Sequence, residues 1–328
     1  MQNDLSTLVR RFIEARDAIR AAFKMESEYI YPVCAQIFLA ADRPVEAEQL
    51  ERCKALVKST TGPFSNFRGN VRLPLLCMLA AGDEPEARWE RTQRCYALLK
   101  EAFFSSQYLA LAALLLGDGA KEADLPALAA RGKGLFQRMK QEHPFLTGQE
   151  DSVFALLLAE SPRSDDALIE DMEACYTRLD QRFPKGDGLQ TASHVLALSD
   201  DAPERKVNRM LSLFDGIEAA GGKYGKDRQL PILAALSLSD GSEEALVADM
   251  LELNGLLAQE KGYKGVFGLD KRTRMMHAAM LLSLPDRQTD LVNAAAQQTT
   301  LAMIAAQQAL MCAVVASSAA STATASSH

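Results

Sequence analysis

The sequence repeats one pattern seven times: an apolar segment rich in Leu and Ala stops at an Asp or Ser, and a charged amphipathic segment follows. The apolar segments end at Asp42, Asp83, Asp118, Ser161, Asp200, Asp240 and Asp286. Their spacing of about 40 residues is typical of stacked helical hairpins. We therefore predict an all-α protein of about seven helical hairpins. They would form either an α-solenoid or a closed α/α toroid, and the period does not distinguish the two.

Each predicted hairpin pairs two kinds of helix. The first is apolar nearly all round, as in residues 109–116 and 232–238, and a helix of this kind is buried on most sides. The second carries one apolar stripe on a charged helix, and residues 4–24 open the chain with such a helix. We expect the first helices to line the inside and the second helices to form an outer, solvated wall.

Two recurring patterns have structural explanations. Asp-x-Pro occurs at 42–44, 83–85, 124–126 and 201–203, which predicts an Asp N-cap followed by Pro in the first helical turn. One register of the second helices holds Cys, Met or Gly, as expected of a packing position rather than a ligand. Its members are Cys53, Cys95, Gly132, Cys175, Met210 and Met250. The six cysteines have no metal-type spacing, and the glycines have no phosphate-loop spacing, so we predict no metal and no cofactor.

Composition limits the partners. A net charge of -7 and a pI near 5.3 argue against a nucleic-acid surface, which usually needs a basic face. Arg10 and Arg11 interrupt the first apolar residues, so the N-terminus does not resemble a signal peptide. We therefore expect a cytoplasmic protein.

The C-terminal part of the chain differs from the repeats, because residues 291–327 carry no charged side chain. We divide the chain into a repeat domain (1–288), an uncharged helix packed on it (289–316) and a disordered tail (317–328). The longest apolar run, residues 309–316, is far shorter than the roughly 20 residues of a membrane-spanning helix. Residues 291–316 could instead pack on the last hairpin, form a homo-oligomer or lie on a membrane surface.

The turns from each second helix to the next first helix hold the candidate functional residues. Each turn contains an aromatic residue that we expect to fill the hairpin junction. Two amides and two arginines fall together in one turn and suit a carboxylate or phosphate, although an ordinary polar turn also explains them. These residues are Asn66, Arg68, Asn70 and Arg72.

A second candidate set has acid/base or ligand chemistry: His143, Glu150, Asp151 and His194. Three of them also have a structural explanation. Glu150 and Asp151 fall at an expected helix start, where the helix dipole favours carboxylates, and His194 fits a position in the core. Lys271 and Arg272 form a local basic cluster at an expected helix start.

Several segments resemble an uncharacterised bacterial domain-of-unknown-function family of about 330-residue helical proteins. They are Gly-Pro-Phe-Ser-Asn-Phe-Arg-Gly-Asn (62–70), Glu-His-Pro-Phe-Leu-Thr-Gly-Gln-Glu-Asp-Ser-Val-Phe-Ala (142–155), Ser-His-Val-Leu-Ala-Leu (193–198), Arg-Met-Met-His-Ala-Ala-Met-Leu (274–281) and Ala-Gln-Gln-Ala-Leu-Met-Cys-Ala (306–313). The resemblance implies a bacterial cytoplasmic protein and carries over no functional residue.

The sequence leaves the activity unknown and favours a non-enzymatic binding or scaffold protein whose partner lies on a concave face or along the turns. The alternative is an enzyme or small-ligand binder with a toroid pocket, in which His143, Glu150, Asp151 and Arg68 would meet.

Overall fold

A computed structural model describes residues 5–119, 121–265 and 268–284 of the chain. These residues contain fourteen α-helices, two short 3-10 helices and no strand, which confirms the all-α prediction. The predicted helix at 289–316, the tail at 317–328 and the oligomer interface at 291–316 lie outside the described residues.

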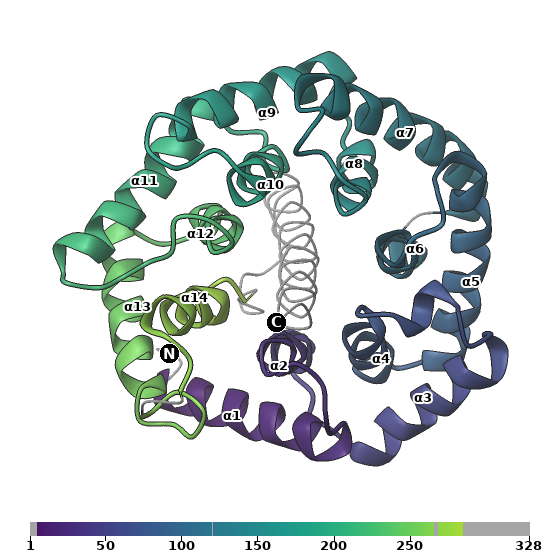
Figure 1. Cartoon of the computed structure of the whole chain (residues 1–328), viewed down its shortest axis with the longest axis horizontal. Helices are drawn as coiled ribbons and strands as arrows, with labels where there is room; N and C mark the ends of the chain where they lie inside the picture. Colours follow the sequence, from purple (N-terminus) through teal and green to yellow (C-terminus); the bar gives the residue numbers. More distant parts are fainter. Residues whose placement is uncertain (1–4, 120, 266–267, 285–328) are drawn as a thin grey trace, which may run out of the picture. The chain divides into compact units, whose positions relative to one another are not determined.

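Long amphipathic helices alternate with shorter apolar ones along the chain (Figure 1). The long helices are α1 (Leu5–Ala22), α3 (Ala47–Thr60), α5 (Pro85–Ala102), α7 (Leu125–Glu142), α9 (Asp165–Leu179), α11 (Pro203–Ala219) and α13 (Glu243–Leu257). The short helices are α2 (Ile30–Ala40), α4 (Arg72–Ala80), α6 (Gln107–Gly119), α8 (Asp151–Ala159), α10 (Asp187–Leu196), α12 (Leu230–Ser237) and α14 (Lys271–Leu282). The 3-10 helices are η1 (Asn66–Arg68) and η2 (Glu122–Asp124).

Burial follows the sequence pattern. Every residue of α8 and of α12 is buried, and α6 buries its whole run from Leu109 to Leu116. In contrast, α3 buries only Leu50, Cys53 and Val57, and its remaining positions are exposed or half-exposed. The predicted difference between apolar and striped helices is therefore confirmed, because burial of apolar surface decides which face of each helix is covered.

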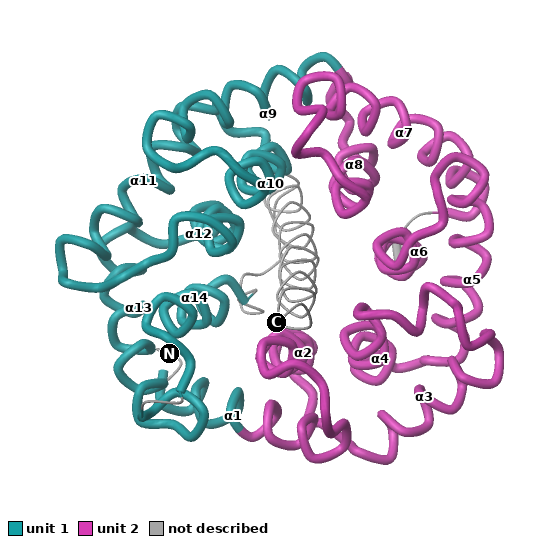
Figure 2. The backbone as a smooth tube through the Cα atoms, in the orientation of Figure 1, with its two compact units in different colours: residues 1–13, 166–310 teal, residues 14–165, 311–328 magenta. Residues whose placement is uncertain are grey.

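The described residues form two compact units, which are coloured separately in Figure 2. Unit 2 consists of residues 14–165, and unit 1 consists of residues 5–13 together with the described residues from 166 onwards. In unit 2, the long helices α3, α5 and α7 pack in succession, while α2 packs against α4 and α6 packs against α8. In unit 1, α11 packs against α13, and α12 packs against both α10 and α14. Each unit thus has one row of long helices and one row of short helices.

The predicted Asp N-caps are wrong for α3, α5 and α11. The helices α5 and α11 begin at Pro85 and Pro203, so the N-cap positions fall on Glu84 and Ala202 rather than on the Asp residues. Asp124 occupies the N-cap of α7 but accepts no capping hydrogen bond from a backbone N–H. The Pro prediction is confirmed for α5, α7 and α11, whereas Pro44 lies before the start of α3.

Arginines connect successive repeats instead. The arginine directly before the Cys/Met/Gly register position on four long helices reaches the start of the next long helix or the turn before it. The contacts are Arg52 Nη2 to Glu86 Oε1 at 3.1 Å, Arg94 Nε to Glu122 Oε2 at 3.2 Å, Arg131 Nε to Asp165 Oδ1 at 2.7 Å, and Arg209 Nη2 to the carbonyls of Ser239 and Gly241 at 2.8 Å each. The register positions themselves are buried, as predicted, and Gly132 is small because Leu156 of α8 occupies the adjoining space.

Candidate functional site

Four turns of unit 2 each connect a long helix to the following short helix. They comprise residues 23–29, 61–71, 103–106 and 143–150. Each turn lies at the N-terminal end of a short helix, and the contacts described below link the first three turns side by side. We call this set of turns the turn edge of unit 2.

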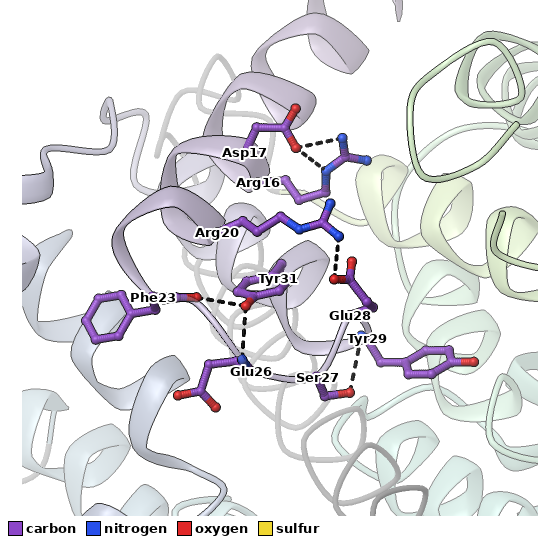
Figure 3. A network of polar contacts seen from close by, with 9 residues as sticks. All are labelled: Arg16, Asp17, Arg20, Phe23, Glu26, Ser27, Glu28, Tyr29 and Tyr31. Carbon is purple, nitrogen blue, oxygen red and sulfur yellow. Dashed lines mark hydrogen bonds and ion pairs between the residues drawn. The ribbon is translucent and has the colours of Figure 1, made fainter. Parts of the chain in front are cut away.

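A hydrogen-bond network holds the first turn (Figure 3). The hydroxyl of Tyr31 donates to the carbonyl of Phe23 at 2.7 Å and accepts from the backbone N–H of Glu26 at 3.1 Å. Burial raises the pKa of the Tyr31 phenol, which keeps this hydroxyl protonated and able to donate. Arg20 also pairs with Glu28 across the turn. The backbone on both sides of Met25 is therefore tied to the helices that flank it.

Side-chain hydrogen bonds join the second turn to the third. The Asn66 side-chain amide donates to Tyr96 Oη and to Ser105 Oγ, each at 2.8 Å. The backbone N–H of Asn70 donates to Gln107 Oε1 at 2.9 Å. Because Ser105 lies in the next turn and Gln107 starts the next short helix, these bonds fix the two turns relative to each other.

The remaining members of the first candidate set also contact the protein. Arg72 forms an ion pair with Glu26 of the first turn, and Arg68 Nη1 lies 3.5 Å from the Thr61 carbonyl of its own turn. Asn66, Arg68 and Asn70 lie in this one turn, and Arg72 begins the helix that follows it. The sequence did not reveal that Asn66 and Arg72 connect that turn to its two neighbours, because their partners are 39 and 46 residues away.

The fourth turn brings together three members of the second candidate set. His143 follows the last residue of α7, and its backbone N–H donates to the Met139 carbonyl at 2.9 Å. Asp151 begins α8 and is buried, and its Oδ2 accepts from the Gly148 N–H at 2.8 Å. Glu150 occupies the N-cap position of α8. Arg68 lies two turns earlier in the chain, so these three residues share a turn with one another and not with Arg68.

The other candidates belong to unit 1. His194 is buried within α10, as its alternative interpretation predicted. Lys271 and Arg272 are exposed at the start of α14, directly after Asp270, whose carboxylate accepts from the Arg272 N–H at 2.8 Å. Among the described residues, no three His, Cys, Asp or Glu side chains lie close enough to hold a metal ion.

Aromatic residues fill most of the hairpin junctions, as predicted. Phe67 of the second turn is buried, with its ring centroid 4.8 Å from those of Trp89 and Tyr96 in edge contacts. Buried aromatics fill five further junctions: Phe23, Phe103, Phe183, Tyr224 and Tyr263. The fourth turn departs from the prediction, because its aromatic residue, Phe145, points into solvent and Thr147 is buried instead.

Each of the four turns exposes one large apolar side chain. Met25, Phe64 and Phe145 are 98–99% exposed, and Phe104 is 86% exposed. We call these four residues the apolar tips. Of the large apolar side chains described in unit 1, none reaches such exposure, and the fifth exposed example, Tyr29, lies in the first turn of unit 2. The adjacent residues Phe103 and Phe104 indicated in the sequence that one aromatic side chain of this turn would be exposed, because only one of the two can fill the junction.

A cation precedes every apolar tip. The last turns of α1, α3, α5 and α7 contain Arg20, Lys58, Lys100 and Lys140. Basic residues at a helix C-terminus interact favourably with the helix dipole, which accounts for their position. The three lysines are exposed, so the turn edge presents apolar and cationic groups together.

Comparison with known proteins identifies the family to which this chain belongs. A family model described as "Protein of unknown function (DUF4003)" matches residues 17–309, and the chain belongs to this family. The resemblance proposed from the sequence is thus confirmed. The relatives include the uncharacterized protein YeaA of Bacillus subtilis (strain 168), which is 26% identical over 274 residues that cover 80% of this chain and 81% of YeaA. No solved structure matches the chain.

Proposed function

We propose that this chain is a non-enzymatic helical-repeat protein that binds a partner along the turn edge of unit 2. The observation that carries the proposal is the exposure of one large apolar side chain in each of four successive turns. Exposing a Phe to water rather than burying it forgoes roughly 2 kcal/mol, so folding alone gives no reason for such a row. The recurrence of the exposed side chain in successive turns, three of which are joined by side-chain contacts, supports an interaction role for this edge.

The geometry of the polar candidates supports binding over catalysis. Asn66 and Arg72 contact neighbouring turns of the protein itself, and Asp151 bonds the backbone of its own turn. These contacts support a structural role for Asn66, Arg72 and Asp151 in holding the turns that carry the apolar tips. The proposal includes the finer architecture predicted from the period, namely a repeat domain over residues 1–288 arranged as an α-solenoid or a closed α/α toroid, in a bacterial cytoplasmic protein.

Photo-crosslinking in cells of the natural host tests the proposal. The residue p-benzoylphenylalanine would replace Phe64, Phe104 or Phe145 in separate full-length variants. It would replace Glu90, an exposed residue of α5, in the control. We expect adducts, whether to protein or to lipid, at the three turn positions and few at position 90. Equal adduct formation at position 90 would refute a binding role for the turn edge.

A further inference from the structure

We infer that the partner of the turn edge is the surface of an anionic lipid bilayer. The apolar tips would enter the boundary between headgroups and acyl chains, and the neighbouring lysines would contact lipid phosphates. This inference rests on the proposed function and adds the chemical class of the partner. It uses the described turns alone and is independent of the uncharged C-terminal segment.

The first argument is the degree of exposure. A Phe side chain that is 98–99% exposed touches almost nothing around it, so Phe64 and Phe145 protrude singly and do not form a continuous patch. A protein partner would need a separate pocket at the position of each tip, because hot-spot residues bind in desolvated pockets. A bilayer is fluid and accepts apolar side chains at any spacing.

The second argument is charge. Lys24 adjoins Met25, and Lys58, Lys100 and Lys140 stand shortly before Phe64, Phe104 and Phe145. Residues 58–72 around Phe64 contain three cations and no anion, although the whole chain carries a net charge of -7. Basic residues beside a membrane-facing apolar surface attract anionic headgroups. The positive charge around Phe64 therefore complements an anionic bilayer, although Arg72 there pairs with Glu26, and acidic residues flank the lysines of the first and fourth turns.

The third argument is the rigidity of the tips. Pro63 and Pro144 directly precede Phe64 and Phe145 and restrict the backbone there. Met25 adopts φ 71°, a left-handed conformation that favours glycine, and yet its side chain is 99% exposed. Strained residues of this kind tend to mark functional positions. A rigid tip also loses little conformational entropy when it inserts.

The corresponding turns of unit 1 carry exposed cations, and their described residues, which leave out 266 and 267, include no exposed large apolar side chain. Lys185, Lys223 and Lys264 are exposed in them, while Phe183, Tyr224 and Tyr263 are buried. These turns provide a matched control surface in the same chain.

Among the residues that the structure describes, no helix is long and apolar enough to cross a bilayer, so the interaction we infer is with the membrane surface.

Vesicle co-flotation of the full-length protein tests the inference. The probes are vesicles of pure phosphatidylcholine and vesicles in which about a third of the lipid is phosphatidylglycerol. We expect the protein to float with the anionic vesicles, and the Phe64→Ser/Phe104→Ser/Phe145→Ser variant to lose about five-fold in partitioning per phenylalanine. Lys58→Glu/Lys100→Glu should also weaken binding, whereas Lys223→Glu/Lys264→Glu in unit 1 should not.

Two further measurements make the outcome decisive. Thermal unfolding should show that the substituted tips leave stability almost unchanged, since Phe64 and Phe145 touch almost nothing and Phe104 has only a surface contact with Lys133, whose Nζ lies 5.8 Å from the ring centroid. Phe64→Trp should give a blue-shifted fluorescence component with anionic vesicles, against the constant signal of the buried Trp89.

Failure of the wild-type protein to float, or full binding by the triple variant, would overturn the bilayer inference. If crosslinking at the tips then still gave protein adducts, the proposed function would stand with a protein partner.

Discussion

The ammonium group of Lys206 on α11 is enclosed by the carboxylate of Asp171 on α9, with Nζ 2.9 Å from Oδ1 and 2.8 Å from Oδ2. The Ser199 carbonyl accepts a third bond at 2.9 Å, so all three ammonium protons have acceptors. Both side chains are almost inaccessible to water, at 0% and 4% exposed. This buried ion pair joins two long helices and the turn that follows α10 within unit 1.

Removing one member of this pair should be strongly destabilising. Lys206→Met leaves a buried carboxylate without its counter-ion, and we expect a loss of about 3–5 kcal/mol in the free energy of unfolding by urea. The double variant Lys206→Met/Asp171→Leu should lose less than the single one, because neither charge remains buried. Lys185→Met is the control, since that side chain is 70% exposed. Additive losses in the double variant would contradict this account.

Buried thiols should make the protein unstable at alkaline pH. Burial, with a smaller contribution from Glu160, raises the pKa of the Cys95 thiol to about 12. An unfolded chain ionises this thiol near its ordinary pKa, so the native state binds the extra proton between about pH 9 and 12. The stabilisation is complete below pH 9 and is lost as the pH rises through this window. We expect Cys95→Ala to reduce the slope of unfolding free energy against pH by up to about 1.4 kcal/mol per unit.

The Arg131 contacts should be specific for the guanidinium group. Nη1 lies 2.9 Å from the Ala159 carbonyl and 2.5 Å from the Ser161 carbonyl, and Nε binds Asp165. Arg131→Ala should cost about 2–3 kcal/mol and speed amide exchange in residues 160–165. Arg131→Lys should recover little of this, since an ammonium group cannot reproduce the planar fork. As a control, Arg91→Ala, at an exposed position of α5, should leave the stability nearly unchanged. An Arg131→Lys variant as stable as the wild type would show that a positive charge alone is enough to hold these contacts.

Two glycines should respond in opposite directions to alanine. A Cβ at Gly188, near the start of α10, would lie 2.3 Å from the Asp227 carbonyl oxygen, so Gly188→Ala must separate α10 from that turn. We expect a loss of at least about 2 kcal/mol. A Cβ at Gly134 within α7 meets nothing, and alanine there should add about 1 kcal/mol through helix propensity. Urea unfolding of both variants measures these changes in the free energy of unfolding. A Gly188→Ala variant that is as stable as the wild type, or a Gly134→Ala variant that is less stable, would contradict the prediction.

The left-handed backbone conformation of Met25 should lower the stability of the protein, and its exposed side chain should contribute to binding. Met25→Gly relieves the left-handed conformation at φ 71°, and we expect the protein to gain about 0.5–1 kcal/mol in thermal or urea unfolding. The same variant should bind anionic vesicles less well. A Gly variant that is less stable than the wild type would show that Met25 serves the fold.

The helical composition and the division into buried and half-buried helices were predictable, because both follow from local periodicity. In α13, for example, Leu246, Met250, Leu253 and Leu257 recur every three or four residues, and these four residues are the buried ones. Helix starts were less predictable. Asp83 was expected to cap α5, but the helix begins at Pro85 and Asp83 pairs with Arg43 instead. Its partner is 40 residues away, so local sequence could not reveal the pairing.

The candidate site, too, was predictable from the sequence only in part. The sequence located it in the turns between repeats and identified polar residues there. It did not indicate that Asn66 contacts Ser105, or that Phe145 remains in solvent although each of the other turns buries one aromatic residue.

By itself, the sequence determined an all-α chain, its alternating helix types, its buried register and the placement of aromatic residues in the turns. These properties depend on residues three or four positions apart, which share a helix face. Tertiary structure decided which turn aromatic is buried and which protrudes, and which arginine meets which carbonyl. Those outcomes depend on whether residues about 40 positions away fill the space beside a side chain, and no local pattern contains that information.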